Sequence, residues 1–527
     1  MRALLGLTVL LLLGACTEAD PTGAPEAAPF DASAAPAPPE AALAAIDAAG
    51  LRQRIAVLTS EGGETGTPSK ATAVASLVEP FRALGLEGGM PDGSFTQDVP
   101  LRSTRVTEAT PLTFTPDTGE PASFAFVADV ALGTDTDAAS VALDGADLVF
   151  VGYGITAPGV AWDDFKGLDV TGKVLVALVG VPPATAEDPT LFQATARADV
   201  GRWTSTYEEA RRRGAKGVLL IHTEAIAGYP FGVVADDAFG THPVAAEPPE
   251  GALEVRGWIR EGAARALAEM AGSSLDDWLK RAGRRDFEPV ELPVEASVAM
   301  QIEQAAGPVG QNVVATIPGT TRADEAVVYS ARLGVGASRE AAEADGIQGD
   351  ASGVAMLLGI AEAFRTAGAP ERTVFLVLFG PEAAGPWGAS VFADTPPVPL
   401  ARTVANINID SGNLFGGTEG LVGIGAERSD LGALLEAAAA AESAIVSGAP
   451  TPRAGRFDRS PPLALARGGV STVTLGTGDR TLGGLVQQTR VAFRLGYGLA
   501  NSDLAPRGQP GDAFGYARRS SLTEAAE

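Results

Sequence analysis

The residues of this chain that could do chemistry include very few imidazole or thiol groups. Its 527 residues contain two histidines, His222 and His242, and one cysteine, Cys16. Histidine and cysteine are common protein ligands of zinc, and histidine is the usual general base beside a nucleophile. The serines of the short strings DASG and DSG, Ser352 and Ser411, have no histidine near them in the sequence. These residues therefore argue against a serine nucleophile activated by histidine.

Both histidines lie in the middle of the chain. His222 ends the apolar run GVLLIH, which is typical of a buried strand. A histidine at the end of such a strand usually packs or forms hydrogen bonds in the core, and we predict this structural role for His222. We predict that His242 lies in a loop.

The segments that must position any site alternate between helical and strand patterns. Residues 41–58 and 72–85 carry apolar residues three and four positions apart, which predicts amphipathic helices. From about Ala146 the chain changes to short strand-like runs, ADLVFVGYG and GKVLVALVG, followed by the helical TYEEARRRGA and the strand GVLLIH. This middle segment is predicted to be a unit of strands and helices.

From Gln311 onwards, strands and helices alternate. The predicted strands are QNVVATIPG, EAVVYSA, TVFLVLF, TVANINID and STVTL, and the predicted helices are SGVAMLLGIAEAFRTA, LGALLEAAAAAE and LVQQTRVAFRLGYGLA. Strands separated by helices indicate an α/β fold in which helices cover both faces of the sheet.

Length and composition limit the class of protein. A chain of 527 residues is too long for one hydrophobic core, so we expect two or three compact units. Hydrophobic residues make up 46% and charged residues 20%, as in ordinary soluble domains. The formal net charge of -26 argues against nucleic acid as a partner.

The first residues predict export and lipid attachment. Residues 1–15 combine an early arginine with an apolar run too short to span a membrane, which is typical of a signal peptide. Leu-Gly-Ala before Cys16 resembles the lipobox at which bacterial lipoproteins are cleaved and lipidated. A lipid on Cys16 would anchor the chain to a membrane in the cell envelope. Thr17, the residue after it, resembles a sorting signal for the outer membrane. In a Gram-negative host we therefore expect the protein at the outer membrane or in the periplasm. Residues 16–40 and 506–527 are predicted to be a disordered linker and tail.

The order of the segments and their amino-acid sequences resemble those of the co-catalytic, di-zinc aminopeptidases related to glutamate carboxypeptidase. The blocks NVVATIPG, DASGVAMLLGIAEAF, TVFLVLFGPEAAG and TVANINID resemble the peptidase core, and the match runs from about Ala41 to Pro506. The segment from VGYGITAPG to GAKGVLLIHTE resembles the protease-associated domain inserted in that family. The resemblance implies a zinc-exopeptidase-like mixed sheet in residues 41–134 and 291–505, with a β-rich inserted domain in residues 135–290.

Such a peptidase holds two zinc ions with histidine and carboxylate ligands, and a separate glutamate deprotonates the attacking water. Arg332 stands where the resemblance implies a histidine ligand. Gly349 occupies the position of the bridging aspartate, and Asp350 lies one residue later. Glu382 keeps the position of the general base, whereas the adjacent ligand position is Ala383. Three ligand positions are therefore changed.

Of the two remaining ligand positions of the family, one is kept in this chain and one is lost. Asp410 ends the strand TVANINID and matches the strand-end metal ligand. The late loop, which carries a Tyr-His-Thr motif in the family, is shortened here to Gly478-Asp479-Arg480-Thr481. Asp410 is therefore the surviving ligand position, and no histidine follows it.

Two functions stay open at this point. The first is a lipid-anchored pseudo-peptidase without metal cofactors, which keeps the cleft for a peptide or protein ligand and in which Arg332 forms an ion pair with Asp410 or Glu382 in place of the metal charge. The second is an active metallo-exopeptidase with one or a non-standard divalent metal, held by Asp350, Asp410 and Glu382. Oxygen-only ligands favour Mg²⁺ or Ca²⁺.

Overall fold

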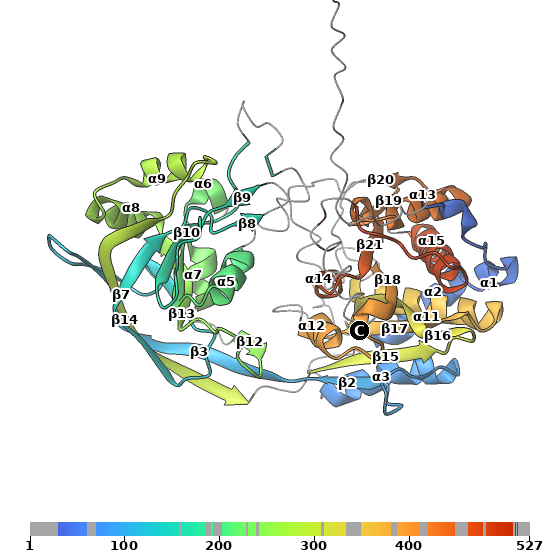
Figure 1. The fold of residues 1–527 in the computed structure, drawn as a ribbon. Helices are drawn as coiled ribbons and strands as arrows, with labels where there is room; N and C mark the ends of the chain where they lie inside the picture. Colours follow the sequence, from blue (N-terminus) through green and yellow to red (C-terminus); the bar gives the residue numbers. More distant parts are fainter. Residues whose placement is uncertain are drawn as a thin grey trace, which may run out of the picture. The chain divides into compact units, whose positions relative to one another are not determined.

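A computed structural model describes the chain from residue 30 onwards, with gaps. The described residues are 30–60, 70–157, 161–184, 191–192, 203–227, 230–238, 242–306, 310–333, 349–380, 387–410, 420–447, 462–477, 481–509, 512 and 514. In these residues the strands form two large sheets, which we call sheet A and sheet B, and one two-stranded sheet (Figure 1).

Sheet A is a mixed sheet of nine strands, and most of it comes from the C-terminal half of the chain. Its strand order is β1-β15-β17-β16-β18-β21-β19-β20, and β2 also pairs with β15. The strands are β1 (Glu87–Gly88), β2 (Thr96–Val99), β15 (Gly310–Ile317), β16 (Arg322–Arg332), β17 (Arg372–Phe379), β18 (Thr403–Ile409), β19 (Leu421–Ile424), β20 (Val446–Ser447) and β21 (Ser471–Thr477).

The centre of sheet A consists of parallel strands. Strand β16 pairs in parallel with β17 and β18, and β18 pairs in parallel with β21. All residues of β17 and β18 are buried. Their near-continuous apolar sequences suit strands that are covered on both faces.

Helices cover both faces of sheet A. Tyr329 of β16 turns to one face, where its hydroxyl donates a hydrogen bond to the carbonyl oxygen of Ala492 in α15 at 3.1 Å. Its neighbour Val328 turns to the other face and packs with Phe392 of α12 and Leu465 of α14. The helices are α1 (Glu40–Ala44), α2 (Ala48–Ser60), α3 (Lys70–Ala83), α11 (Gly349–Ala367), α12 (Trp387–Asp394), α13 (Leu431–Ala441), α14 (Leu463–Arg467) and α15 (Leu482–Ala500), with 3₁₀ turns at Ala32–Ala34, Leu400–Arg402 and Ala426–Arg428. The predicted α/β fold class is confirmed.

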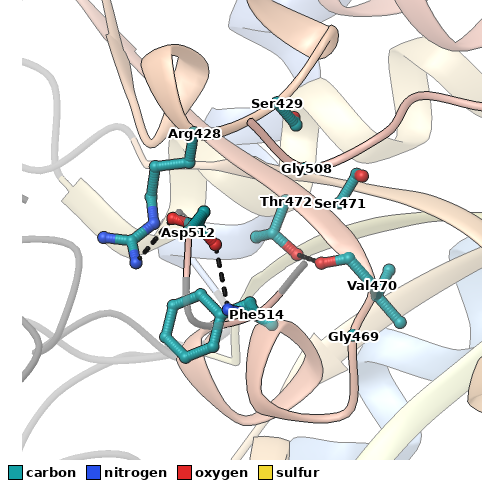
Figure 2. Close-up of a pocket in the computed structure, with 10 residues that line it drawn as sticks. Arg428, Ser429, Gly469, Val470, Ser471, Thr472, Gly508, Asp512 and Phe514 are labelled. Atoms are coloured by element: carbon teal, nitrogen blue, oxygen red, sulfur yellow. Dashed lines mark hydrogen bonds and ion pairs between the residues drawn. The ribbon is translucent and has the colours of Figure 1, made fainter. Parts of the chain in front are cut away.

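The start of the predicted tail packs on the protein. Gly508 forms an isolated bridge with Ser429, and Asp512 forms an ion pair with Arg428 at 3.0 Å (Figure 2). The guanidinium of Arg428 also lies 4.6 Å from the centre of the Phe514 ring. The prediction of a disordered tail is therefore wrong for residues 506–509, because backbone hydrogen bonds of Arg507 and Gln509 hold this stretch.

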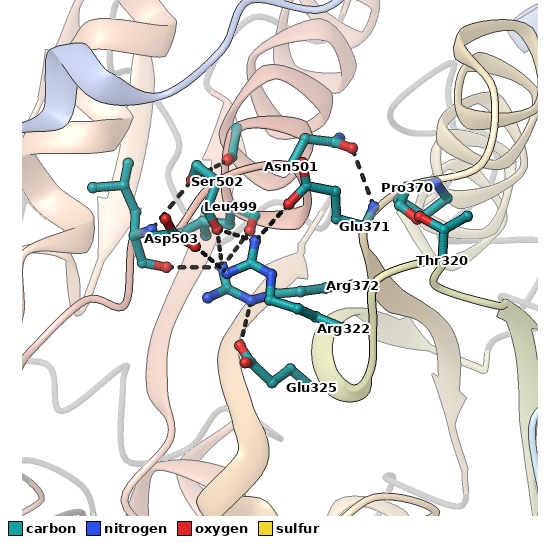
Figure 3. Close-up of polar contacts among 12 residues, drawn as sticks. Thr320, Arg322, Glu325, Pro370, Glu371, Arg372, Leu499, Asn501, Ser502 and Asp503 are labelled. Atoms are coloured by element: carbon teal, nitrogen blue, oxygen red, sulfur yellow. Dashed lines mark hydrogen bonds and ion pairs between the residues drawn. The ribbon is translucent and has the colours of Figure 1, made fainter.

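Two arginines at the amino ends of β16 and β17 hold the end of α15 (Figure 3). Nη1 of the buried Arg372 donates hydrogen bonds to the carbonyl oxygens of Leu499, Ser502 and Leu504 at 2.6, 2.8 and 2.9 Å. Its Nε donates to Glu325 at 2.6 Å. Burial lowers the pKa of Arg372, and the hydrogen bond that it donates to Glu325 opposes that shift. The network satisfies carbonyl groups that a helix end leaves without partners.

Sheet B has ten strands and is more antiparallel. Its strand order is β12-β3-β14-β7-β10-β11-β13-β6, with β4 and β5 beside β14. The strands are β3 (Leu101–Ala109), β4 (Leu112–Pro116), β5 (Ala122–Phe124), β6 (Val130–Gly133), β7 (Ser140–Phe150), β10 (Val174–Leu178), β11 (Gly217–His222), β12 (His242–Ala245), β13 (Val255–Arg260) and β14 (Val290–Ala306). Strands β8 (Thr156–Ala157) and β9 (Trp162–Asp163) form the two-stranded sheet.

Separate apolar clusters cover the faces of sheet B. One contains α8 (Glu261–Met270) and α9 (Leu275–Ala282), and the other contains α5 (Trp203–Arg212) and α7 (Gly232–Ala238). The short α6 (Glu224–Ala227) follows β11.

The limits of sheet B differ from the predicted insert of residues 135–290. Strands β3 to β6 lie before that segment and β14 extends beyond it, so sheet B takes strands from residues 101–306. At the other end, residues 32–34 form a 3₁₀ turn inside the predicted linker of residues 16–40. Both differences arise because pairing with distant strands and helices orders segments whose own patterns are weak.

Candidate functional site

The central strands of sheet A end at one edge, where the residues of interest follow them. Because parallel strands point the same way, the carboxyl ends of β16, β17, β18 and β21 meet at this edge. Arg332 ends β16, Gly380 follows β17, Asp410 follows β18 and Thr477 ends β21. In open α/β sheets, ligands bind outside the carboxyl ends of the strands. We call this edge the carboxyl edge of sheet A.

Asp410 is positioned by its backbone. Its N–H donates a hydrogen bond to the carbonyl oxygen of Leu475 in β21 at 2.9 Å. Its own carbonyl oxygen accepts one from Nε2 of the buried Gln488 in α15 at 3.4 Å. The residue as a whole is partly exposed. A strand and a helix therefore hold a carboxylate at the surface of the carboxyl edge.

Arg332 lies beside Asp410 in the sheet but is exposed. Ala331 and Ile409 are paired across β16 and β18, and Arg332 and Asp410 are the next residue on each strand. Within the described part of the chain, no ion pair joins their side chains. The predicted Arg332–Asp410 ion pair is therefore wrong, because the arginine side chain turns towards solvent. Its other predicted partner, Glu382, lies outside the described residues.

A row of buried polar side chains lies below the carboxyl edge. Ser330 Oγ lies 2.9 Å from Oδ1 of Asn406 and 3.0 Å from Oδ1 of Asn408. Nδ2 of Asn408 donates to Oγ1 of Thr474 at 3.3 Å. One hydroxyl hydrogen can serve only one of the two amide oxygens, so one amide must turn its nitrogen towards Ser330. This row ties β16, β18 and β21 together two residues before Asp410.

Asn312 of β15 holds both ends of the segment that carries Glu382. Its side chain is fully buried; Nδ2 donates to the carbonyl oxygen of Gly388 at 2.8 Å, and Oδ1 accepts from the N–H of Gly380 at 3.1 Å. A Cβ at Gly388 would lie 2.4 Å from that Oδ1, so this close approach requires glycine. Asn312 was not among the predicted site residues, although its place in the apolar run QNVVATI was a usable signal.

Several predicted site residues lie outside what the structure describes. They are Cys16, Glu382, Ala383, Ser411 and Gly478. Gly349 and Asp350 begin α11, but the positions of their side chains are also outside the described part. Ser352, in the first turn of α11, is buried.

Both histidines belong to sheet B. His222 ends β11 and is 1% exposed, with its ring 5.4 Å from Phe231 and 6.1 Å from Trp258 in edge contacts. This packing agrees with the structural role predicted for it. His242 begins β12 and pairs with Thr104, so the prediction of a loop is wrong for its backbone. Sheet A therefore contains no histidine.

The described residues of this edge do not form a metal centre. No three histidine, cysteine, aspartate or glutamate side chains among them lie close enough together to hold a metal ion. The pocket beside Arg428 and Asp512 has a volume of about 20 Å³, which is room for one water molecule (Figure 2). It lies at the amino end of β21, opposite the carboxyl edge.

Residues 312–497 match the family model "Peptidase family M28". This part of the chain is therefore a peptidase family M28 domain, in agreement with the resemblance to co-catalytic aminopeptidases. No curated protein matches the chain.

Solved structures of zinc aminopeptidases and related proteins are similar over most of the chain. An aminopeptidase from Aneurinibacillus sp. strain AM-1 is 16% identical, with 89% of this chain and 96% of that chain covered and a TM-score of 0.42. A zinc aminopeptidase from Bacillus subtilis is 14% identical, with 89% and 98% covered and a TM-score of 0.38. A peptidase M28 precursor from Shewanella amazonensis SB2B is 17% identical, with 89% and 98% covered and a TM-score of 0.38.

Proposed function

We propose that the M28 domain binds a peptide or protein segment at the carboxyl edge of sheet A and does not hydrolyse it by two-zinc chemistry. The observation that carries this proposal is the location of the histidines. The chain has two, and they belong to β11 and β12 of sheet B. A two-zinc peptidase site without imidazole would have to hold both ions with carboxylates alone.

The ligand positions that can be traced support the same conclusion. Arg332 is a permanent cation at the end of β16, and a guanidinium repels a metal ion instead of ligating it. Gly349 has no side chain that could bridge two metals, and Ala383 has no donor atom. Asp410 supplies a carboxylate at the carboxyl edge. This donor set does not fit two zinc ions.

The edge itself is suited to binding. Its strands are tied together by the buried polar row of Ser330, Asn406, Asn408 and Thr474, and Asn312 contacts both Gly380 after β17 and Gly388 in α12. Arg332 and Asp410 present one positive and one negative group side by side. A peptide has both charges at its ends, so the pair offers complementary contacts without a metal.

An assay with aminoacyl-p-nitroanilides tests the loss of catalysis. The full-length protein, purified in detergent, is incubated with leucine, alanine and lysine p-nitroanilides in added Zn²⁺, Mg²⁺ or Ca²⁺, and the Asp410→Asn variant is the matched control. We expect the same background rate for both proteins in every metal. Hydrolysis that a chelator stops and that D410N lacks would overturn the proposal in favour of an oxygen-ligand metallopeptidase.

Binding is tested separately with a pool of random hexapeptides labelled on the side chain of an added lysine, so that both ends of the peptide keep their charge. We expect fluorescence anisotropy to rise with added protein, and Arg332→Glu to weaken the binding by about tenfold because it reverses one charge of the pair. Arg402→Glu, an exposed change away from the carboxyl edge, is the control. Equal binding by R332E and the unchanged protein would remove the carboxyl edge from the proposal.

We also propose that the chain is exported and anchored by a lipid on Cys16. The support is the apolar run before Leu-Gly-Ala-Cys and the proline-rich stretch after it. Among the helices of the described residues, none is long and apolar enough to cross a membrane. Labelling of the expressed protein with radioactive palmitate tests the anchor, with Cys16→Ser as control; label in C16S, or none in the unchanged chain, would contradict it.

A further inference from the structure

A second cavity lies within sheet B. It has a volume of about 170 Å³ and is bounded by residues of β3, β6, β13, α5 and α7. Ala131 and Gly133 of β6 and Arg256 and Trp258 of β13 turn to the face that α5 and α7 cover. Val106 and Leu132, which belong to the apolar cluster of the other face, also line the cavity.

Aromatic rings form much of the cavity wall. The ring of Trp203 lies 5.5 Å from Tyr207 and 6.0 Å from Trp258, in tilted or edge contacts. Tyr207 and Trp258 are buried, whereas Trp203 is 39% exposed. A tryptophan with this exposure at the rim of an apolar hollow leaves ring surface for a ligand to cover.

Positive charge gathers on one side of the cavity. Asp135 lies 2.7 Å from Nε of Arg256 and 2.8 Å from Nε of Arg211, and its carbonyl oxygen accepts from Nη2 of Arg102 at 3.0 Å. Three guanidinium groups therefore share this aspartate, with Asp137 also acting on Arg102. In a chain with a net charge of -26, this is a local excess of cations beside an aromatic wall.

Two cations line the cavity, Arg105 and Arg256, and Arg105 already forms an ion pair with Glu303. The contact of Nε of Arg256 with Asp135 lacks hydrogen-bond geometry, and within the described residues its terminal nitrogens have no hydrogen-bond partner. Its guanidinium carbon lies 5.9 Å from the centre of the Tyr207 ring. Paired donors of this kind suit a carboxylate, which arginine binds through two parallel hydrogen bonds.

We propose that this cavity binds the α-carboxylate end of an apolar amino acid or peptide. The side chain of that residue enters the cavity against the rings of Trp203 and Trp258, and its carboxylate binds Arg256. A cavity of about 150 Å³ holds one benzene ring, so a volume of about 170 Å³ suits a single large apolar side chain. In one terminal residue the ring and the carboxylate are close enough together to contact the tryptophan rings and Arg256 at the same time. This site is separate from the carboxyl edge of sheet A and does not depend on its function.

Four probes distinguish the parts of the proposal by isothermal titration calorimetry on the full-length protein. N-acetylphenylalanine has both the ring and the carboxylate, its amide lacks the carboxylate, and N-acetylalanine lacks the ring. Blocked Ala-Ala-Phe with a free carboxyl end represents a peptide. We expect the two probes with ring and carboxylate to bind, and the other two to bind at least about tenfold more weakly. Tighter binding of the tripeptide would show that the cavity contacts residues before the terminal one, and equal binding of the two probes would show that the terminal residue alone is recognised.

Two variants test the position of the ligand. A Cβ at Gly133 meets no atom within 4 Å, so Gly133→Leu fills the cavity without a clash at its Cβ, and we expect it to abolish binding. Arg256→Gln should reduce the affinity of the carboxylate probes to that of the amide. Arg260→Gln, on the same strand but outside the cavity, is the control and should bind as the unchanged protein does.

Three results would contradict the proposal or part of it. Absence of binding by all four probes at about 10 mM would show that the cavity does not bind this class of ligand. Equal binding of N-acetylphenylalanine and its amide would exclude the role of Arg256. Binding that survives in the folded G133L protein would place the ligand elsewhere, and thermal unfolding of that variant shows whether it is folded.

Discussion

Arg332 and Asp410 are neighbours in sheet A, yet no ion pair joins their side chains in the described structure. They follow directly after Ala331 and Ile409, which are paired across β16 and β18. Neighbouring strands lie about 4.8 Å apart, so the two backbones are close. The side chain of Arg332 is nevertheless exposed, whereas Asp410 is only partly exposed.

This relationship predicts that the two residues contribute independently to stability. In a double-mutant cycle with Arg332→Ala and Asp410→Ala, we expect a coupling energy below about 0.5 kcal/mol, because exposed side chains without a shared contact are nearly additive. The measurement is the free energy of unfolding in urea for the four proteins. A coupling above about 1.5 kcal/mol would show that the ion pair forms in solution.

Replacing Arg372 should lower the free energy of unfolding much more than replacing Arg402, another arginine of the same domain. Arg372→Met leaves Glu325 and the carbonyl oxygens of Leu499 and Leu504 without this donor, whereas Ser502 keeps Arg322, so we expect a loss of about 3–5 kcal/mol. Arg402 forms an ion pair with Asp324 in which both side chains are at least half exposed, and R402M should cost less than about 1 kcal/mol. Urea unfolding followed by circular dichroism compares the two. Similar losses would show that the network at the end of α15 is not a main support of the domain.

Two glycines of α15 should respond to alanine in opposite directions. A Cβ at Gly496 would lie 1.9 Å from the hydroxyl of Tyr329, whose ring is fully buried, so Gly496→Ala should cost about 1–3 kcal/mol through overpacking. A Cβ at Gly483 meets only Oγ1 of Thr481 at 3.4 Å. Gly483→Ala should therefore be neutral or stabilise the helix by up to about 1 kcal/mol. Thermal unfolding of both variants gives the comparison, and a stabilised G496A would contradict the packing described here.

Asp164 should make sheet B less stable as the pH rises. Burial raises the pKa of its carboxyl from 3.8 to about 7, although hydrogen bonds from the N–H of Ile155 at 3.0 Å and from Nε1 of Trp162 at 2.8 Å oppose the shift. The folded chain therefore keeps a proton that the unfolded chain loses at lower pH. Between about pH 4 and pH 7, the free energy of unfolding should fall by up to about 1.4 kcal/mol per pH unit from this group.

The Asp164→Asn variant isolates that contribution, because it removes the titrating group and keeps its shape. We expect the difference in unfolding free energy between the two proteins to move in favour of D164N as the pH rises from about 4 to about 7. Urea unfolding at four pH values measures it. A difference that stays constant, or that moves in favour of Asp164, would show that the hydrogen bonds outweigh burial.

The sequence predicts the centre of sheet A well because its patterns are local. TVFLVLF and TVANINI are continuous runs of strand-forming residues, and both are fully buried strands. The 17-residue strand β14 was not predicted even though its buried residues alternate, and the predicted boundary at residue 290 assigned nearly all of it to the peptidase-like part instead of sheet B. Strands β3 to β6 carry weaker patterns, and their order comes from pairing with β14 and β13.

The candidate site was predicted in position but not in its contacts. The resemblance placed Arg332 and Asp410 at strand ends, and the parallel register confirms that the two strands end side by side. The direction of a long exposed side chain does not follow from sequence position, so the ion pair was wrong. Asn312 was missed because its partners, Gly380 and Gly388, lie about 70 residues away in the chain.

The central claim is that this M28 domain lacks a two-zinc centre, and metal stoichiometry tests it most directly. The full-length protein is equilibrated with excess Zn²⁺, freed of unbound metal by gel filtration and analysed by inductively coupled plasma mass spectrometry, with D410N beside it. We predict fewer than about 0.2 zinc ions per chain in both proteins, because the domain supplies no imidazole ligand. Two zinc ions per chain in the unchanged protein, lost in D410N, would contradict the account.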